Sequence, residues 1–233
     1  MPPESKAKRK ERALEIMRRL EEAHPGATTE LRWKTPLQLL VATILSAQCT
    51  DERVNRVTAE LFKRYRTARD FASADPATLE EEIKPTGFYR NKAKAVIGAA
   101  KMIVEEFGGQ VPRTMEEMLR LPGVQRKTAN VVLGTAYGLP TGIVVDTHVD
   151  RVSKRLGLVA TSVKQAEKIE RQLMDLFPQD HWITVGHAMV LHGRYVCTAR
   201  KPNCAECVLN DLCPKLGVEP QRKPRRSTGR RAQ

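Results

Sequence analysis

Four cysteines crowd into one short run near the end of the chain, and this run limits what the chain can fold into more than any other feature. They are spaced C-x6-C-x2-C-x5-C, as Cys197, Cys204, Cys207 and Cys213. Four thiolates this close together can close a tetrahedral metal site or hold an iron–sulfur cluster. A pair of disulfides is the alternative. The N-terminal residues are basic with no apolar segment behind them, however, so nothing indicates export to an oxidising compartment.

The spacing of the cysteines distinguishes the two kinds of metal site. Structural zinc sites usually contain two C-x2-4-C pairs. Here there is one such pair, Cys204 and Cys207, and the gaps on either side of it are wider. This pattern favours a [4Fe–4S] cluster over zinc. The remaining cysteine, Cys49, lies far away in the sequence, and we assign it no ligand role.

The chain of 233 residues carries a formal net charge of +13, which indicates a polyanionic partner. Most of the excess lies at the two ends: residues 1–12 hold five Lys or Arg against two Glu, and residues 214–233 hold seven against one. We expect basic disordered tails over 1–11 and 216–233. The C-terminal tail either raises affinity for DNA without reading sequence or only keeps the protein in solution. No apolar stretch is long enough to span a bilayer, so we expect no membrane contact.

Apolar residues recur at helical spacing through most of the chain, which predicts an all-α fold. The only run of β-branched residues, 143–145, is too short to anchor a sheet. Helix-capping residues and Pro or Gly breaks set the expected boundaries. We expect helices over 12–23, 36–45, 51–65, 76–83, 91–107, 115–121, 126–137, 147–156, 164–176 and 184–197.

Residues 119–133 predict two short helices joined by a turn at Pro122 and Gly123. Backbone N–H groups at the start of the second helix have no partner within the helix, so they form an anion site suited to a DNA phosphate. From spacing alone, Lys127 in this hairpin is a solvated lysine that contacts phosphate. Asp146, which follows the β-branched run, is by the same standard a helix N-cap.

Four segments together resemble the endonuclease III family of the helix-hairpin-helix DNA glycosylase superfamily. The resemblance covers roughly residues 13–215. It implies a six-helix barrel domain over 28–140, with the helix-hairpin-helix at about 115–137. An iron–sulfur cluster domain would comprise 12–27 plus 141–215, with a DNA cleft between the two. The segments are Leu45-Ser-Ala-Gln-Cys-Thr-Asp51, Leu121-Pro-Gly-Val-Gln-Arg-Lys-Thr-Ala-Asn130, Val145-Asp-Thr-His148 and the cysteine loop.

The resemblance implies a bifunctional DNA glycosylase and AP lyase of base excision repair. Its partner would be double-stranded DNA containing damaged pyrimidines or abasic sites. Lys127 matches the catalytic lysine, whose amine can form a Schiff base with the sugar, as water or a hydroxyl could not. We expect the positive end of the helix dipole and partial burial both to disfavour its ammonium form. Asp146 matches the catalytic carboxylate, which would stabilise positive charge on the sugar and assist proton transfers.

Two residues are expected to act when a nucleotide is flipped out of the duplex. Gln48 matches the family's gap-filling glutamine, which hydrogen-bonds to the orphaned base. Phe88 falls where the family places a wedge side chain, commonly leucine, and an aromatic wedge would stack more extensively. The alternative for Phe88 is an ordinary core aromatic. His148 is either a DNA contact or a hydrogen-bonded polar residue.

The remaining DNA contacts are expected from the hairpin and the cysteine loop. The hairpin would contribute Gly123, Gln125 and Arg126, with a monovalent cation at its turn as a further candidate ligand. Arg200 and Lys201, between the first two cysteines, would be held toward phosphate by a loop pinned on the cluster. The cluster is therefore expected to be structural and to position DNA.

The sequence departs from the family pattern in three places. Gln125 replaces the second glycine of the hairpin turn, where a positive φ angle or a close backbone approach would exclude a side chain. The connection 139–145 is one residue longer than expected, and the basic tails are additional. Two alternatives are an adenine-specific mismatch glycosylase, whose branch lacks the lysine, and a non-catalytic iron–sulfur DNA-binding protein. We expect a monomer in the bacterial cytoplasm, associated with the nucleoid.

Overall fold

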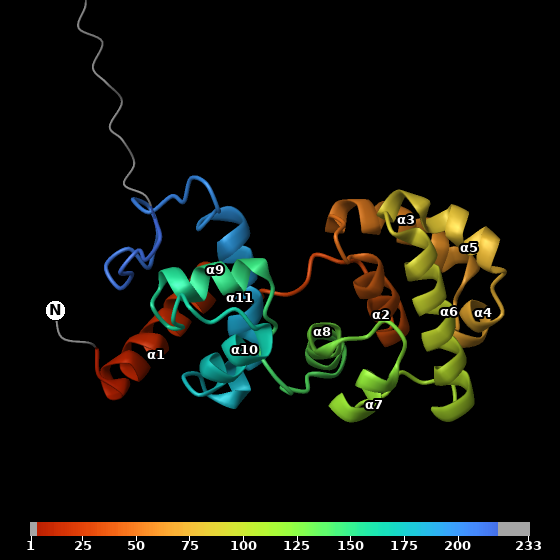
Figure 1. Cartoon of the computed structure of the whole chain (residues 1–233), viewed down its shortest axis with the longest axis horizontal. Helices are drawn as coiled ribbons and strands as arrows, with labels where there is room; N and C mark the ends of the chain where they lie inside the picture. The colour runs from red at the N-terminus through yellow and green to blue at the C-terminus, as the bar shows by residue number, and fades with distance from the viewer. Residues whose placement is uncertain (1–3, 219–233) are drawn as a thin grey trace, which may run out of the picture.

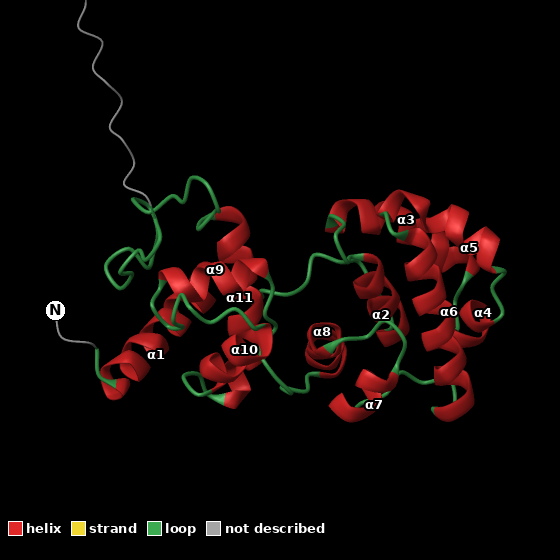
Figure 2. Ribbon diagram, in the orientation of Figure 1, coloured by secondary structure: helices red, strands yellow, loops and turns green. Residues whose placement is uncertain are grey.

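The computed structural model describes residues 4–218, and within that range it contains helices and loops but no strand (Figure 2), which confirms the predicted all-α fold class. The elements in chain order are α1 (Lys6–Ala23), α2 (Pro36–Leu45), α3 (Asp51–Arg64), α4 (Ala68–Ala72), α5 (Pro76–Ile83), η1 (Lys84–Thr86), α6 (Tyr89–Glu106), α7 (Met115–Arg120), α8 (Arg126–Tyr137), α9 (Thr147–Arg155), α10 (Ala166–Met174), η2 (Gln179–His181) and α11 (Trp182–Tyr195).

The helices are arranged in two lobes, and the chain crosses between them twice (Figure 1). Helices α2 to α8 form one lobe, which we call the α2–α8 lobe. Helix α1 lies with α9, α10 and α11 in the other, the α1/α9–α11 lobe. Each lobe has its own cluster of buried hydrophobic side chains, one drawn from residues 31–144 and the other from residues 13–20 and 143–209.

The β-branched run 143–145 joins the two clusters. Val144 belongs to the cluster of the α2–α8 lobe, whereas Ile143 and Val145 belong to that of the α1/α9–α11 lobe. In extended backbone, successive side chains point in opposite directions, so a short alternating segment can bury side chains in two cores at once. This second crossing of the chain therefore fixes the position of Asp146, the next residue.

Side-chain caps mark the beginnings of most helices. The capping oxygen in each case accepts a hydrogen bond from a backbone N–H of the first turn, which would otherwise have no partner. Proline occupies the first position of α2 and α5, where its missing N–H and fixed φ angle fit a helix start. The capping residues are Ser5, Thr35, Thr50, Thr67, Asp75, Thr114 and Asp146.

The predicted N-terminal tail is wrong for residues 6–11, because α1 begins at Lys6. Ser5 caps this helix by accepting from the N–H of Lys8. Arg12 then forms an ion pair with Glu4 at 2.8 Å and donates to the carbonyl of Leu156 at 2.7 Å. These contacts between the helix start and the folded lobe offset the charge repulsion that predicted disorder.

The predicted C-terminal tail also begins too early. Leu216 donates its backbone N–H to the carbonyl of Arg155 at 3.2 Å, so the first residues of that tail lie against α9. The rest of the predicted tail, 219–233, lies outside the described residues, as do residues 1–3.

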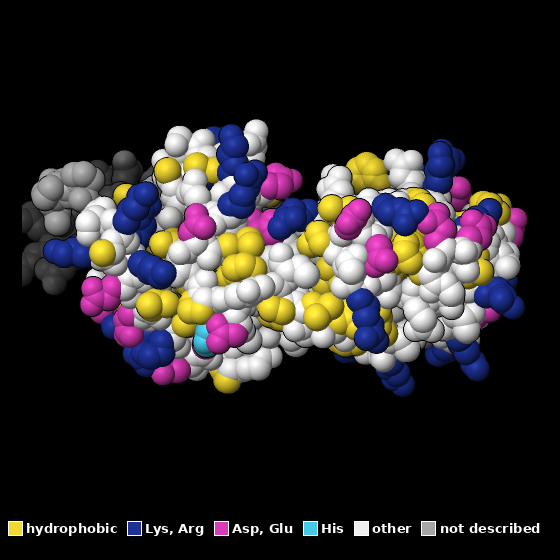
Figure 3. Space-filling model, turned by 90° about the horizontal axis from the view of Figure 1, so that it is seen from below, with side chains coloured by type: hydrophobic (Ala, Val, Ile, Leu, Met, Phe, Trp, Pro, Cys, Tyr) yellow, Lys and Arg dark blue, Asp and Glu magenta, His cyan; other side chains and the backbone are white. Residues whose placement is uncertain are grey.

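Charge on the described surface is mixed. On the face shown in Figure 3, Lys and Arg side chains lie among Asp and Glu side chains over both lobes. Within the described range, none of the helices combines the length and the apolar character needed to cross a membrane.

Candidate active site and iron–sulfur site

The hairpin between α7 and α8 turns at a glycine that no other residue could replace without a shift of the backbone. Gly123 has φ of +75°, and the N–H of Val124 closes the turn by donating to the carbonyl of Leu121 at 3.1 Å. A Cβ atom on Gly123 would lie 2.5 Å from the Cβ atom of Ala95 on α6. Glycine is therefore required here by both its φ angle and the close approach of α6.

Gln125 does not distort the hairpin. Its backbone is extended, with φ of −105° and ψ of 171°, and its side chain is exposed. The positive φ angle that would have excluded a side chain is absent. The first backbone bond of α8 runs from the N–H of Ala129 to the carbonyl of Gln125, so the N–H groups of residues 126–128 have no partner within the helix. The anion site expected at this turn retains its donors.

Lys127 and Asp146 line the same pocket between the two lobes. The pocket also includes Thr43 of α2 and His187 of α11, and it encloses about 530 Å³, part of it open to solvent. Lys127 lies in the first turn of α8 and is exposed, so the partial burial expected from the sequence is not found in the protein alone.

Asp146 is the N-cap of α9, as the sequence predicted. One carboxylate oxygen, Oδ1, accepts from the N–H of His148 at 2.8 Å and from the N–H of Val149 at 2.9 Å. Among the described residues the second oxygen, Oδ2, has no hydrogen-bond partner. The helix start therefore holds one oxygen and leaves the other for a ligand in the pocket.

Arg126 is engaged in the protein, although the sequence suggested a DNA contact. Its guanidinium donates to the carboxylate of Glu170 on α10 at 2.6 and 3.0 Å, and this bond raises the pKa of Arg126. Glu170 is only 4% exposed and accepts a further bond from Asn130 at 2.7 Å. A Cβ atom on Gly142 would lie 2.0 Å from the same carboxylate. The arrangement joins the start of α8 to the opposite lobe.

A second ion-pair group joins the lobes among the residues that line the pocket, and the sequence did not predict it. Arg194 of α11 donates to Asp51, the first residue of α3, at 2.7 Å, and it also pairs with Glu30 in the α1–α2 connection. Tyr195 donates its hydroxyl to the same Glu30. The only signal in the sequence is the Gly-Arg-Tyr segment before Cys197, and its partners lie more than 140 residues away.

Gln48 and Phe88 share an unusual backbone conformation. Their φ angles are +53° and +48°, in the left-handed region that non-glycine residues rarely adopt. Both side chains are exposed. Phe88 is 64% exposed, so the alternative that placed it in the core is wrong. Strained residues held at the surface are typical of binding sites, where surrounding contacts maintain them.

His148 has a hydrogen-bond partner within the protein. Its Nδ1 atom lies 3.2 Å from Nη2 of Arg151, which also donates to the carbonyl of Gly193 at 2.7 Å. A Cβ atom on Gly193 would lie 2.7 Å from the Cβ atom of His148, so α9 and α11 approach closely at this point. The ring is partly buried beside the pocket rather than free at the surface.

The four cysteines of the loop line one pocket beside α9 and α11. Hydrogen-bond donors lie beside three of the four sulfur atoms. Arg155 donates to Sγ of Cys197 at 3.3 Å, the N–H of Leu209 to Sγ of Cys207 at 3.4 Å, and the N–H of Lys215 to Sγ of Cys213 at 3.3 Å. Such donors stabilise thiolate ligands and orient them toward a metal centre.

The four thiols match the ligand set of an iron–sulfur cluster, which is commonly held by four cysteines. Four thiolates around one pocket fit a larger group, in which each sulfur binds a different iron. Burial raises the pKa of the Cys207 and Cys213 thiols, so a bound metal must displace their protons.

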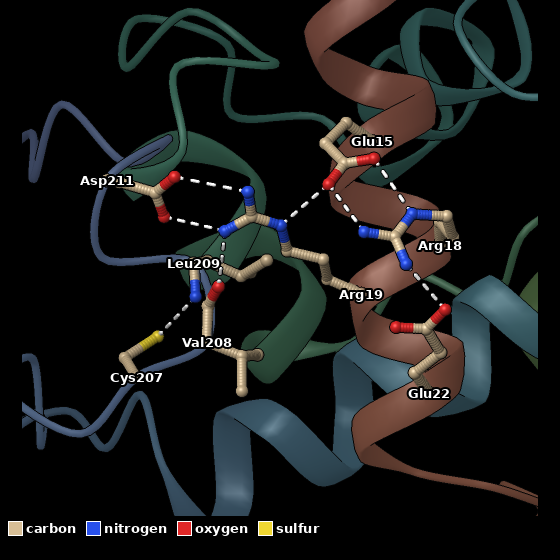
Figure 4. Close-up of polar contacts among 8 residues, drawn as sticks. All are labelled: Glu15, Arg18, Arg19, Glu22, Cys207, Val208, Leu209 and Asp211. Carbon is tan, nitrogen blue, oxygen red and sulfur yellow. Dashed lines mark hydrogen bonds and ion pairs between the residues drawn. The ribbon is translucent and has the colours of Figure 1, made fainter.

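The cysteine loop is pinned from two helices. Arg155 of α9 is 8% exposed and donates to the carbonyls of Thr198 at 2.7 Å and Ala199 at 2.8 Å. From α1, Arg19 donates to the carbonyl of Val208 at 3.0 Å and forms an ion pair with Asp211 (Figure 4). These contacts fix the backbone of the loop next to two exposed cations, Arg200 and Lys201.

Comparison with known proteins gives two family matches. Residues 41–179 match the HhH-GPD superfamily base excision DNA repair protein, and residues 197–213 match the iron-sulfur binding domain of endonuclease III. The hairpin, the pocket and the cysteine loop are thus those of a helix-hairpin-helix protein of base excision DNA repair.

Individual relatives place the chain more narrowly. An endonuclease III from Synechocystis sp. is 57% identical over 208 residues, which cover 89% of this chain and 94% of the relative. Two solved structures, a non-covalent endonuclease III–DNA complex and a trapped endonuclease III–DNA covalent intermediate, each have a TM-score of 0.84 and 42% identity. Each covers 88% of this chain, and this chain covers 95% and 96% of theirs.

The chain belongs to the endonuclease III family, which confirms the resemblance seen in the sequence. It is a DNA glycosylase and AP lyase of base excision repair that binds DNA. The iron–sulfur binding domain at residues 197–213, within which the four cysteines lie, holds a [4Fe–4S] cluster.

Protein purified without oxygen should contain about four iron and four sulfide per chain, because four cysteines surround one pocket. Metal and sulfide analysis checks this. Replacing Cys204 with Ser should lower the iron content, whereas Cys49→Ser, outside the loop, should leave it unchanged. Stoichiometric zinc without iron or sulfide would contradict the assignment.

Gly123→Ala should lower stability more than Gly138→Ala, although both glycines have positive φ angles of +75° and +66°. Only Gly123 has a neighbour in the way, since nothing lies within 4 Å of a Cβ atom on Gly138. The φ angle alone costs about 1–2 kcal/mol in each variant, and the clash adds about 1–3 kcal/mol at Gly123.

Urea unfolding measures both variants. In a double variant, Ala95→Gly should recover the part of the Gly123→Ala loss that the clash causes. Equal losses at the two glycines would show that the close approach of α6 does not matter.

Proposed function

We propose that this protein excises oxidised pyrimidines of the thymine-glycol type from double-stranded DNA and then cuts the strand at the abasic site. Lys127 is the nucleophile and Asp146 the catalytic carboxylate. The observation that carries the proposal is that these two residues, nineteen positions apart and in different lobes, line one pocket. The covalent intermediate named for a similar protein is consistent with a nucleophile in this pocket.

In the first step, Nζ of Lys127 attacks C1′ of the damaged nucleotide. A C1′–N bond to the lysine forms as the C1′–N bond to the base breaks, and the base takes up a proton as it leaves. The resulting aminal opens by breaking the C1′–O4′ bond, which gives the Schiff base. Loss of a C2′ proton then expels the 3′ phosphate by β-elimination. Lys127 lies in the first turn of α8, so its side chain starts at the edge of the pocket that Asp146 also lines.

Asp146 acts through the oxygen that the helix cap leaves free. Oδ1 is held by two backbone N–H groups, which fix the carboxylate at the edge of the pocket. Oδ2 faces positive charge as it develops on the sugar and carries protons to and from the amine and O4′. The residue is thus both an N-cap and a catalytic group.

The damaged nucleotide reaches this pocket by leaving the helix stack. Gln48 and Phe88 enter the gap, Gln48 toward the orphaned base and Phe88 as a stacking wedge. Their exposed side chains and strained backbones support these roles. The hairpin turn at Gly123 and Gln125 binds a phosphate through its free N–H groups and a monovalent cation through its backbone carbonyls.

The two lobes act as two domains with DNA across the cleft between them. One is the barrel at 28–140, and the other is the cluster domain, which takes in the whole of α1 (Lys6–Ala23) together with 141–215. His148 and Arg126 lie beside this cleft and support it from within the protein. The protein works as a monomer in the cytoplasm on the bacterial nucleoid. Lys127 in the pocket argues against the adenine-specific branch, which lacks this lysine, and against a non-catalytic role.

Lys127→Gln should abolish borohydride trapping on an abasic duplex, because no Schiff base can form without the amine. Glutamine is a good helix former, so folding and the cluster should survive. The matched control is Lys101→Gln, an exposed lysine on α6, which should trap normally. A reducible adduct with Lys127→Gln would mean that another amine is the nucleophile.

Asp146→Asn should reduce the single-turnover rate on a thymine-glycol duplex by about 100-fold or more, because the charge that stabilises the cationic transition state is gone. Asparagine keeps a capping oxygen, so the start of α9 should hold. Trapping at a preformed abasic site should persist, since Lys127 remains. Wild-type rates on thymine glycol would remove Asp146 from the mechanism.

Arg200→Ala and Lys201→Ala should each lower the salt slope of log K for DNA binding by about 0.9 if each side chain contacts one phosphate. The loss should be the same for different DNA sequences, because phosphate carries no base information. Titrations at several salt concentrations measure the slope. Unchanged slopes in both variants would take the cysteine loop out of the DNA footprint.

A further inference from the structure

Lys92 of α6 is a charged side chain in the core of the α2–α8 lobe. It is only 5% exposed, and no carboxylate among the described residues pairs with it. Its ammonium group instead donates to two backbone carbonyls, of Leu45 and of Thr86, each at 2.8 Å. Burying an ammonium group is unfavourable unless hydrogen bonds replace its water, and burial lowers the pKa of Lys92. A methionine or leucine would fill this position more simply.

The two carbonyls end the segments that precede the two strained residues. Leu45 is the last residue of α2, and Gln48 follows three positions later. Thr86 is the last residue of η1, and Phe88 follows two positions later. The backbone N–H of Lys92 also donates to the carbonyl of Phe88 at 3.1 Å. One buried residue therefore contacts the segment before Gln48, the segment before Phe88, and the Phe88 backbone.

We propose that Lys92 is a positioning residue that sets the separation of Gln48 and Phe88, so that both side chains enter the gap left by a single flipped nucleotide. This inference rests on the gap-filling roles proposed above. The ammonium group bonds to both segments at once, so neither can shift without losing a hydrogen bond. Left-handed conformations at non-glycine residues persist only where surrounding contacts maintain them. Lys92 makes such contacts to the segments of both Gln48 and Phe88.

Two kinds of substrate should depend on Lys92 to different extents. A paired lesion must be extruded from the stack and its gap filled before chemistry, so its excision depends on both side chains. A preformed abasic site has no base to unpair, so attack by Lys127 depends less on them. A role in folding alone would reduce activity on both substrates together.

The test compares Lys92→Met with Lys101→Met, the same change at an exposed position of the same helix. Single-turnover excision is measured on a thymine-glycol duplex, and borohydride trapping on an abasic duplex. Losing two hydrogen bonds should slow excision on the order of tenfold, with trapping changed by less than about threefold. A 2-aminopurine base opposite the lesion should show a smaller fluorescence change on binding. Lys101→Met should match the wild type throughout.

Lys92→Arg keeps the donors and should recover most of the excision rate. In a Phe88→Ala background, Lys92→Met should add little further loss, because the side chain that it positions is already gone. Equal losses on the two substrates, no loss on the paired lesion, or full additivity with Phe88→Ala would each overturn the inference.

Two further controls keep the outcomes distinct. Gln48→Ala and Phe88→Ala test the gap-filling roles directly. If neither variant slows excision of the paired lesion selectively, the gap-filling roles of Gln48 and Phe88 are wrong. If both variants slow it selectively but Lys92→Met does not, only the role of Lys92 is overturned. If Lys92→Met does not fold, Lys92→Gln, which retains a donor, replaces it. Lys92→Gln should also slow excision of the paired lesion more than trapping at the abasic site, to a smaller degree, and equal effects on the two substrates would overturn the inference.

Discussion

The ion pair between Arg126 and Glu170 is the interaction on which the arrangement of the site depends. A carboxylate as buried as Glu170 is stable only where cations and hydrogen-bond donors satisfy it, and Arg126 and Asn130 supply both from one face of α8. Lys127 is the next residue after Arg126, so the same contact that neutralises Glu170 fixes the start of α8 against the opposite lobe. Lys127, the proposed nucleophile, is therefore held in place by an ion pair that its neighbour Arg126 makes.

The pocket lies between two separate cores, so its shape depends on how the lobes are joined. The run 143–145 places side chains in both cores, and Arg194 joins α11 to Asp51 and Glu30, which line the pocket with it. Each link acts across a boundary where interfaces within a chain are commonly polar and open to motion. Together they hold Lys127 and Asp146 in one cavity between the lobes.

Much of the fold could be predicted because its signals are local. Capping residues and prolines mark helix starts within one turn, and the apolar period marks the buried face. Helix α4 could not be predicted, since five residues show no period. It forms through a capping box between Thr67 and Asp70, and Phe71 stacks on Tyr65 at 4.9 Å. The start of α1 was missed for a similar reason, because it depends on contacts with residues more than 140 positions away.

The residues of the candidate site also differ in whether local sequence reveals them. Lys127, Asp146 and the cysteines lie in motifs that can be read in order along the chain. Glu170 and Arg194 lie in no such motif, and their partners are distant in sequence. The partners of Lys92 are backbone carbonyls, which every residue has, so its sequence context does not reveal them. Glu170 lies 44 residues after Arg126, so the sequence does not reveal their ion pair, and a basic residue beside a hairpin turn predicts a DNA contact instead.

The place of α1 has a consequence for how the chain matures during synthesis. Ile16 and Leu20 are buried with residues that come from the last third of the described chain, whereas the core of the α2–α8 lobe is drawn entirely from residues 31–144. At about 5–20 residues per second, α1 emerges on the order of ten seconds or more before its partners exist. The α2–α8 lobe can therefore fold on the ribosome before α1 has its partners. During this time α1 is an amphipathic basic helix whose apolar face is uncovered. Final closure of the α1/α9–α11 lobe then brings both ends of the described chain together.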